Sequence, residues 1–238
     1  MSENKECNIC RKLGTGIFVM IGLIALGFFI SKGLTRIANQ EQYVTVKGLA
    51  EREVMSNKVV WPLPYKCVSN DMQQLYDEIE KNKEIIITFL KEGGISDSEI
   101  IVSAPAVTDR LAQSYIPDNV KFRYQAEAVI TVISPQVEKV IELMGKQIEL
   151  MKDGIIISDE YNYQTQFEYT ALNDIKPEMV EEATRNARAV AQKFAEDSDC
   201  KLGNIRQATQ GQFSITSDET TPQIKNIRVV TTVKYELK

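Results

Sequence analysis

Small and apolar residues recur at every fourth position through the stretch from Ile175 to Ile205. This spacing is typical of an amphipathic helix with one buried face. Most of the repeated residues are alanines, so we expect the helix to lie close against a sheet, with Val180, Val190 and Phe194 widening the buried face. The repeated residues are Met179, Ala183, Ala187, Ala191 and Ala195.

The two ends of this helix carry signals of their own. Pro177 is acceptable in a first turn, and Asn173 and Asp174 precede it as capping candidates. Gly203 interrupts the period, and the residues after it begin to alternate as in a strand. We therefore expect a helix that starts just before Pro177 and leads into a strand.

Alternation with a period of two predicts strands on both sides of this helix. In the first strand Val44 and Val46 alternate with polar residues, and Gly48 is expected to form a turn. In the second, Pro62 and Pro64 indicate an edge or an irregular stretch, because proline cannot donate to a β-ladder. The predicted strands are 43–54, 59–68, one within 95–110, 121–133, 161–169, 204–215 and 225–237.

Several of these strands have a recognisable buried face. Trp61, the only tryptophan, is expected in the core. The apolar residues from Phe122 to Val132 share one face of their strand. The alternating aromatic residues from Tyr161 to Tyr169 are expected to cover a helix layer, and a ligand-binding role for these tyrosines is the alternative.

Two further helices are predicted. The first is capped by Ser69 or Asn70 and runs to about Glu92, where two glycines stop it. The second opens at Pro135 and closes near Gly154, and residues 117–119 are expected to form a loop.

Strand, helix, strand, strand therefore occurs twice, over 59–133 and over 161–237, at an offset of about 105 residues. The identity between the two copies is weak, so the repeat is one of pattern. Two such units, with helices on one face of a mostly antiparallel sheet, predict an α+β domain with a helix layer.

The N-terminal region has a different character. From Leu13 to Ile30 the chain carries no charge for 18 residues, and basic residues flank this run on both sides. We interpret 13–31 as a transmembrane anchor, 32–42 as a linker and 43–238 as the main domain. The basic residues nearly balance on the two sides of the anchor, so the charges leave its orientation open. The interpretation of 1–12 as a cytoplasmic tail rests partly on a family resemblance. A cleaved signal peptide is the rival interpretation, but no clear cleavage site follows the apolar run.

Charge and composition exclude several functions. The formal net charge is -5 and the pI is near 5.1, and no basic stripe with interleaved aromatic residues is present, so nucleic-acid binding is not expected. The chain has no histidine, which disfavours a hydrolase triad and a zinc enzyme. We assign no catalytic, cofactor-binding or metal-binding residue.

Four cysteines leave a thiol function open. Cys7 and Cys10 form one CxxC pair in the tail, which could be half of a shared zinc site, a redox pair, an acylation site or two reduced thiols. Cys67 and Cys200 lie in the main domain and could form a disulfide outside the cytoplasm, although spacing alone does not place them within reach.

Loop carboxylates are the remaining chemical candidates. A carboxylate enzyme or a small-ligand site would require a pocket that joins several of them to Tyr161 or Tyr163. No nucleophile or phosphate-binding glycine loop accompanies them, so an enzyme is not expected. The candidate carboxylates are Asp159, Glu160, Asp197, Asp199, Asp218 and Glu219.

Four segments of the main domain share a recognisable order and spacing. They are VTVKGLAEREV from residue 44, FLKEGGISDSEI from residue 89, YQAEAVITV from residue 124 and ATRNARAVAQKFAEDSDCKLGNI from residue 183. Together these segments resemble the SIMPL domain family of bacterial envelope proteins. The resemblance covers about 43–237 and implies an extracytoplasmic domain, large homo-oligomers and a link to oxidative-stress defence, but no catalytic residue. Cys200 and the CNIC tail depart from the family pattern.

These observations lead to one leading hypothesis. The protein is expected to be a single-pass inner-membrane protein with its main domain in the periplasm, where strand edges assemble copies of the chain. A thiol-based redox or metal-responsive factor, using Cys7 and Cys10 or Cys67 and Cys200, is the alternative.

Overall fold

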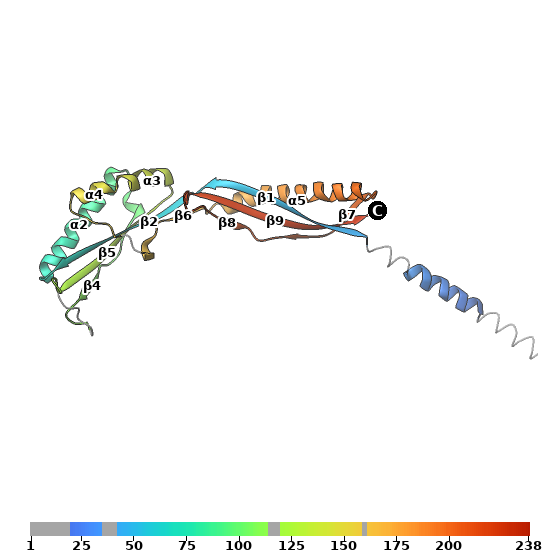
Figure 1. Ribbon diagram of the computed structural model, residues 1–238, viewed down its shortest axis with the longest axis horizontal. Coiled ribbons are helices and arrows are strands. Elements are labelled where there is room, and N and C mark those ends of the chain that lie inside the picture. Colours follow the sequence, from blue (N-terminus) through green and yellow to red (C-terminus); the bar gives the residue numbers. More distant parts are fainter. Residues whose placement is uncertain (1–19, 35–41, 114–119, 159–160) are drawn as a thin grey trace, which may run out of the picture. The chain divides into compact units, whose positions relative to one another are not determined.

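The computed structural model describes residues 20–34, 42–113, 120–158 and 161–238 (Figure 1). The chain divides into two compact units. The first unit comprises Met1–Leu49, Ala183–Gly211 and Thr231–Lys238, and the second comprises Ala50–Glu182 and Gln212–Val230. Each unit is described by itself.

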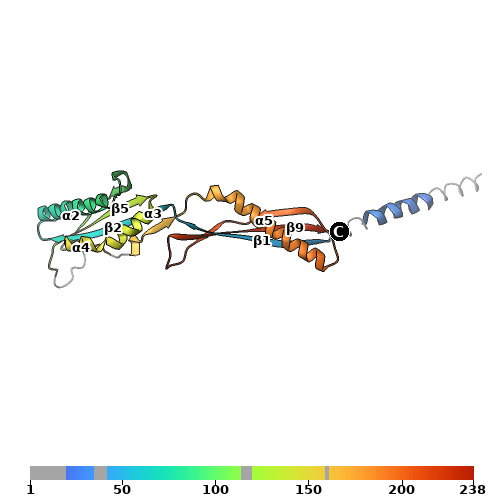
Figure 2. The same ribbon diagram turned by 90° about the horizontal axis from the view of Figure 1, so that it is seen from above.

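One antiparallel sheet is built from strands near both ends of the chain. Its order is β1 (Tyr43–Met55), β9 (Ile224–Leu237) and β7 (Leu202–Gln210), and the short β8 (Ser214–Thr216) also pairs with β9. In the first unit, α5 (Leu172–Asp197) lies against one face of this sheet through Ala187 and Ala191, which pack with Val46, Val233 and Tyr235 (Figure 2). The expected helix on a sheet is confirmed there.

The buried face of α5 is narrower than the sequence suggests. All five residues of the predicted period-four stripe, from Met179 to Ala195, are at most 2% exposed. Val190 and Phe194, which were expected to widen this face, are 40% and 54% exposed. A stripe of alanines brings the helix so close to the sheet that only one row of side chains fits between them.

Gly48 shows how close this approach is. A Cβ atom at this position would lie 1.8 Å from the Ala183 carbonyl oxygen and 2.5 Å from the Ala187 nitrogen. The predicted turn at Gly48 is therefore wrong, because β1 continues through it. The glycine is required by the close approach of the helix backbone, not by a change of chain direction.

The start of α5 also differs from the prediction. The helix begins at Leu172, so Pro177 lies inside it, and Asn173 and Asp174 are helical residues rather than caps. The Asp174 N–H donates to the Ala171 carbonyl oxygen at 3.1 Å, so the chain closes its first turn without a side-chain cap.

The second sheet lies within the second unit and is also antiparallel. Its order is β3 (Ile100–Val102), β5 (Tyr124–Ser134), β2 (Lys58–Ser69) and β6 (Gln166–Glu168), and β4 (Ala106–Asp109) extends the pairing of β5. The helices α2 (Met72–Glu92), α3 (Val137–Lys146) and α4 (Ile148–Lys152) cover one face of it (Figure 1). Two short 3-10 helices, η1 (Asp97–Glu99) and η2 (Tyr161–Tyr163), also belong to this unit.

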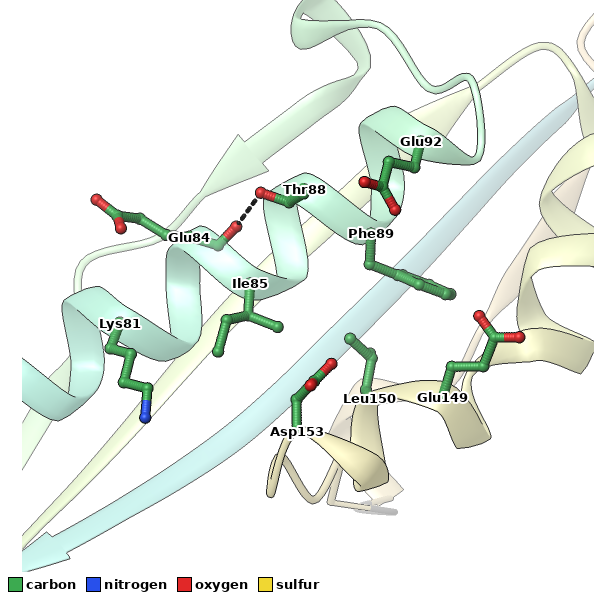
Figure 3. A pocket seen from close by; sticks show the side chains of 9 residues that line it. All are labelled: Lys81, Glu84, Ile85, Thr88, Phe89, Glu92, Glu149, Leu150 and Asp153. Atoms are coloured by element: carbon green, nitrogen blue, oxygen red, sulfur yellow. Dashed lines mark hydrogen bonds between the residues drawn. The ribbon is translucent and has the colours of Figure 1, made fainter.

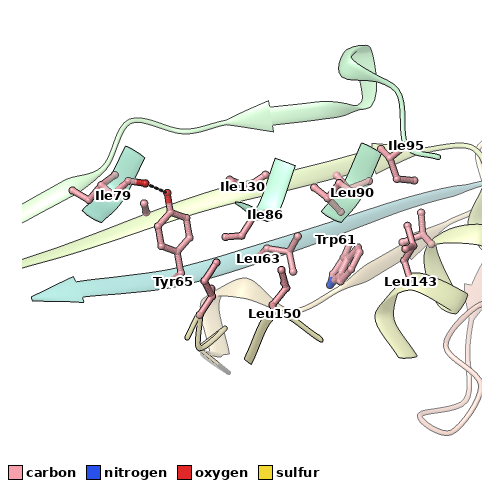
Figure 4. Packing of buried hydrophobic residues seen from close by; sticks show 14 of the residues in the cluster. Trp61, Leu63, Tyr65, Ile79, Ile86, Leu90, Ile95, Ile130, Leu143 and Leu150 are labelled. Carbon is pink, nitrogen blue, oxygen red and sulfur yellow. Dashed lines mark hydrogen bonds between the residues drawn. The ribbon is translucent and has the colours of Figure 1, made fainter. Parts of the chain in front are cut away.

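The core of this unit lies between the sheet and these helices. Trp61 and Leu63 of β2 pack beneath Ile86 of α2 (Figure 4), and Trp61 is only 2% exposed, which confirms the prediction of a core tryptophan. The Tyr65 hydroxyl donates to the Ile79 carbonyl oxygen at 3.3 Å, and burial raises the pKa of Tyr65 to about 12. The apolar face predicted for β5 is buried from Ala126 to Val132.

The backbone carbonyl groups of Pro62 and Pro64 point away from β5, the strand that pairs with nearly the whole length of β2. The Pro64 carbonyl oxygen accepts from the Ser158 N–H at 2.8 Å, on the side opposite β5. Because alternate residues of a strand direct their backbone groups to the same side, Pro62 faces the same way. The strand β6 pairs only with Lys58 to Val60, and an isolated bridge joins Tyr65 to Ile157 farther along. The prolines therefore lie on the irregularly paired side of β2, in agreement with the predicted irregular stretch.

Helix α2 ends at Glu92, as predicted, but its N-cap lies later in the chain than the predicted Ser69 or Asn70. Asp71 caps the helix by accepting from the N–H groups of Gln73 and Gln74, whereas Ser69 and Asn70 precede the cap. Gly94 then adopts a positive φ of 83°, which a side chain would disfavour. The single second helix that was predicted is divided in the structure into α3 and α4, which are separated at Gln147. Its predicted end near Gly154 is confirmed.

The internal repeat is present, but one copy is nested in the other. In the first copy β5 lies between β2 and the β3 and β4 strands, and in the second β9 lies between β1 and the β7 and β8 strands. The first strand of the second copy is therefore β1, and the predicted strand 161–169 is wrong. Tyr161 to Tyr163 form η2, and only Gln166–Glu168 pair as β6. The α+β class is confirmed.

The predicted anchor is not confirmed. Residues 20–34 form a helix, whereas 1–19 and the linker residues 35–41 lie outside the described residues, as does the loop expected at 117–119. Among the residues that the structure does describe, none belongs to a helix with both the length and the apolar character needed to cross a membrane.

Candidate functional site

The strand β1 has one open edge in the first unit. It follows directly after the N-terminal region and pairs with β9 on one side. No other strand of the described part of the chain pairs with its opposite side. Such an edge presents backbone donors and acceptors that another strand can use.

The backbone directions along this edge follow from two hydrogen bonds. The Gln42 carbonyl oxygen accepts from the Leu237 N–H at 3.0 Å, so Gln42 directs its backbone groups toward β9. The Leu49 carbonyl oxygen accepts from the Asn186 side chain at 2.9 Å, so Leu49 points the other way. Alternation between these two ends directs Tyr43, Thr45 and Lys47 outward.

The other edge of the sheet is less suited to pairing. Strand β7 shifts register against β9 twice, between Leu202 and Ile205 and again between Ile205 and Gln207. Such irregularities twist an edge and interrupt its ladder. The regular stretch of β1 from Tyr43 to Lys47 is therefore the better template for a further strand.

Apolar and charged side chains border this edge. Tyr43 is 47% exposed, and the Lys234 ammonium lies over its ring, 3.3 Å from the centroid. Asn186, whose side chain reaches the end of the edge at Leu49, is followed at helical spacing by the exposed Val190 and Phe194 of α5. The edge thus combines free backbone groups with exposed apolar surface.

The thiols do not form the disulfide considered for the main domain. Cys67 and Cys200 are both free. Cys67 is buried, and its sulfur accepts from the Asn82 side chain at 3.3 Å. Burial is the main cause that raises the pKa of the Cys67 thiol, with a smaller contribution from Glu78, so its reactive thiolate is disfavoured.

Cys200 lies in a different setting, and the tail cysteines are not described. Cys200 is partly exposed beside a cavity of about 330 Å³ that Arg188 and Lys201 also line. Cys7 and Cys10 lie outside the described residues. No second thiol stands beside Cys200 within the part of the chain that the structure covers, so a thiol pair is not assembled there.

The structure does not gather the candidate carboxylates. Asp218 accepts from the backbone and side chain of Thr220, and these hydrogen bonds hold its pKa below the usual range, as in a local turn. Asp199 lies two residues after the end of α5, in the left-handed region with φ of 52°. Tyr161 is 87% exposed, so its side chain is open to solvent.

The other candidates of this group follow the same pattern. Asp197 and Glu219 are exposed, and Asp159 and Glu160 lie outside the described residues. Over the described ranges, no three Cys, Asp or Glu side chains come together in a way that could hold a metal ion. The outward backbone groups of β1 were missed at the level of sequence, because their direction depends on the pairing with β9.

Comparison with known proteins gives one family. The model of the SIMPL family, described as a protein of unknown function (DUF541), matches residues 44–235. A search of the curated proteins found no match.

Proposed function

The chain belongs to the SIMPL family, and we propose that it is a membrane-anchored envelope protein whose β1 edge joins further copies of the chain into a homo-oligomer. The main domain would lie in the periplasm, as the resemblance to envelope proteins implies. A contribution to oxidative-stress defence would then come from the assembled envelope structure rather than from a thiol of the main domain.

The observation that carries the assembly proposal is the open edge of β1. Its outward N–H and C=O groups, at Tyr43, Thr45 and Lys47, match the ladder of any extended segment, and they have no strand partner among the described residues. Lys47 is the one charged residue between Tyr43 and Leu49, so little repulsion protects the edge. A second copy offers a strand of suitable length in its own β1.

Membrane anchoring is supported by the surface of the N-terminal helix. Residues 20–34 are all exposed, and the large apolar side chains among them are between 54% and 72% exposed, a concentration that is unusual on a soluble surface. Phe29, the most exposed of them, stands beside Phe28 at a ring separation of 6.4 Å. The uncharged run from Leu13 to Ile30 extends this apolar character.

Size-exclusion chromatography coupled to light scattering tests the assembly proposal. A protein shortened to residues 40–238 keeps both hydrophobic cores. Every side chain of the 20–34 helix is exposed, so removing this helix uncovers no core residue. We expect one discrete species with a mass that is a whole multiple of the monomer mass. A monomer at all accessible concentrations would contradict assembly through the main domain.

Fractionation of cells tests the anchor separately. We expect the full chain to remain in the membrane pellet after a high-salt and alkaline wash, to be released by detergent, and residues 40–238 to be found in the soluble fraction. These results follow from burying a continuous apolar helix in lipid. Release of the full chain by salt alone would show a peripheral attachment instead.

A further inference from the structure

A groove in the second unit lies between α2 and α4. It encloses about 440 Å³, which falls within the range of small-molecule sites. Helix α2 lines it from Lys81 to Glu92, three turns or about 17 Å of helix, and the opposite wall is formed by Glu149 to Asp153 (Figure 3). The groove is distant in sequence from the β1 edge and does not depend on it.

The floor of this groove is apolar. Ile85 and Phe89 of α2 and Leu150 of α4 point into the space between the helices (Figure 3). Leu150 is only 1% exposed, and Ile85 and Phe89 pack against the core while keeping part of their surface open. An apolar body of a ligand would cover this surface and gain the free energy of its burial.

The rim of the groove carries mostly negative charge. Glu92 on α2 and Glu149 and Asp153 on the opposite wall border the groove, whereas the Glu84 carboxylate points away from it (Figure 3). Among the described residues that line the groove, Lys81 is the one cation. No ion pair of the described chain involves any of these four carboxylates. Carboxylates on both walls leave an excess of negative potential over an apolar floor.

We propose that this groove binds small organic cations, namely amines with an aromatic or aliphatic body. The amine is held by carboxylates from both walls, and the apolar body covers the exposed parts of Ile85 and Phe89 beside the buried Leu150. An anionic ligand is disfavoured by the same carboxylates, and a neutral one lacks their attraction.

Tryptamine is a suitable probe, with tryptophol as its neutral isostere and indole-3-acetate as the anionic one. Binding to the full chain in detergent is measured by amide chemical-shift changes and by calorimetry. We expect tryptamine to shift the amides of Ile85, Phe89 and Leu150, and tryptophol to bind several-fold more weakly. Indole-3-acetate is expected to produce no shift at these residues.

Charge removal on the two walls provides the matched comparison. The double variant Glu92→Gln and Glu149→Gln is expected to weaken tryptamine binding about fivefold to twentyfold, because each exposed charge pair is worth a factor of up to about five. Glu138→Gln, an exposed carboxylate on α3 that does not line the groove, is expected to change binding less than twofold.

Three results would overturn the proposal. One is that tryptamine shifts no amide of the groove at millimolar concentration. Another is that tryptamine and tryptophol bind with equal affinity, which would remove the role of the carboxylates. The third is that Glu138→Gln weakens binding as much as the double variant does.

Discussion

Replacing Gly48 by alanine is expected to lower the free energy of unfolding by about 3 kcal/mol or more, the upper end of the cost of overpacking a core. The added methyl group would lie 1.8 Å from the Ala183 carbonyl oxygen and 2.5 Å from the Ala187 nitrogen. Both are backbone atoms of α5, so the conflict is relieved only if the whole helix moves away from β1. Denaturant unfolding followed by circular dichroism measures the effect.

Gly145→Ala is the matched control, because it is the same chemical change in an open place. Gly145 lies in α3, and nothing stands within 4 Å of the position where its Cβ would be. Alanine in a helix is favoured over glycine by up to about 1 kcal/mol, so this variant is expected to be slightly more stable. Equal stability changes in the two variants would refute the close approach of α5 to β1.

Replacing Thr45 by proline is expected to convert the assembly of residues 40–238 into monomers. Proline removes the N–H that Thr45 directs outward, and its ring occupies the space that a partner strand needs. The ladder with β9 keeps its hydrogen bonds, because those belong to the neighbouring residues Val44 and Val46. Size-exclusion chromatography coupled to light scattering measures the mass of the variant, and circular dichroism verifies that the variant is folded.

Thr45→Val controls for the loss of the threonine side chain. Valine keeps the N–H group and the β-branched shape that favours a strand, so this variant is expected to assemble as the unchanged chain does. If Thr45→Pro assembles normally while folded, the β1 edge is not the contact between copies. If Thr45→Val is also monomeric, the side chain rather than the backbone edge makes the contact.

The buried face of α5 could be predicted because it depends on local spacing alone. A row of alanines at every fourth position can be buried only along one line of a helix, and the structure buries that row. The width of the face could not be predicted from the same pattern. Val190 and Phe194 remain exposed because the close contact at Gly48 leaves no room for larger neighbours, and that contact joins residues far apart in the chain.

The wrong strand from Tyr161 to Tyr169 shows the limit of alternation as a signal. The period of two is present there, but a strand also needs a partner, and only Gln166–Glu168 find one, at the end of β2. The place that this segment would have taken in the second sheet copy is filled by β1. Nested topology of this kind leaves no local trace, because pairing of β1 with β9 joins the two ends of the main domain.

The candidate site could be predicted only in its general nature. An assembly function through a strand edge was expected, but which edge is open depends on the sheet order, and which backbone groups point outward depends on register. The groove between α2 and α4 was missed for a related reason. Its carboxylates are ordinary exposed residues of two separate helices in the sequence, and only the packing of these helices places them around one apolar floor.

Residue-resolved amide hydrogen exchange along β1 tests the central claim most directly, because it compares outward and inward groups of one strand. At concentrations where residues 40–238 assemble, the account predicts protection of the outward amides of Thr45 and Lys47, comparable to that of the inward amides of Val44 and Val46. On dilution to monomers, Thr45 and Lys47 are expected to lose this protection while Val44 and Val46 keep it. Fast exchange of Thr45 and Lys47 in the assembled state would contradict assembly through the β1 edge.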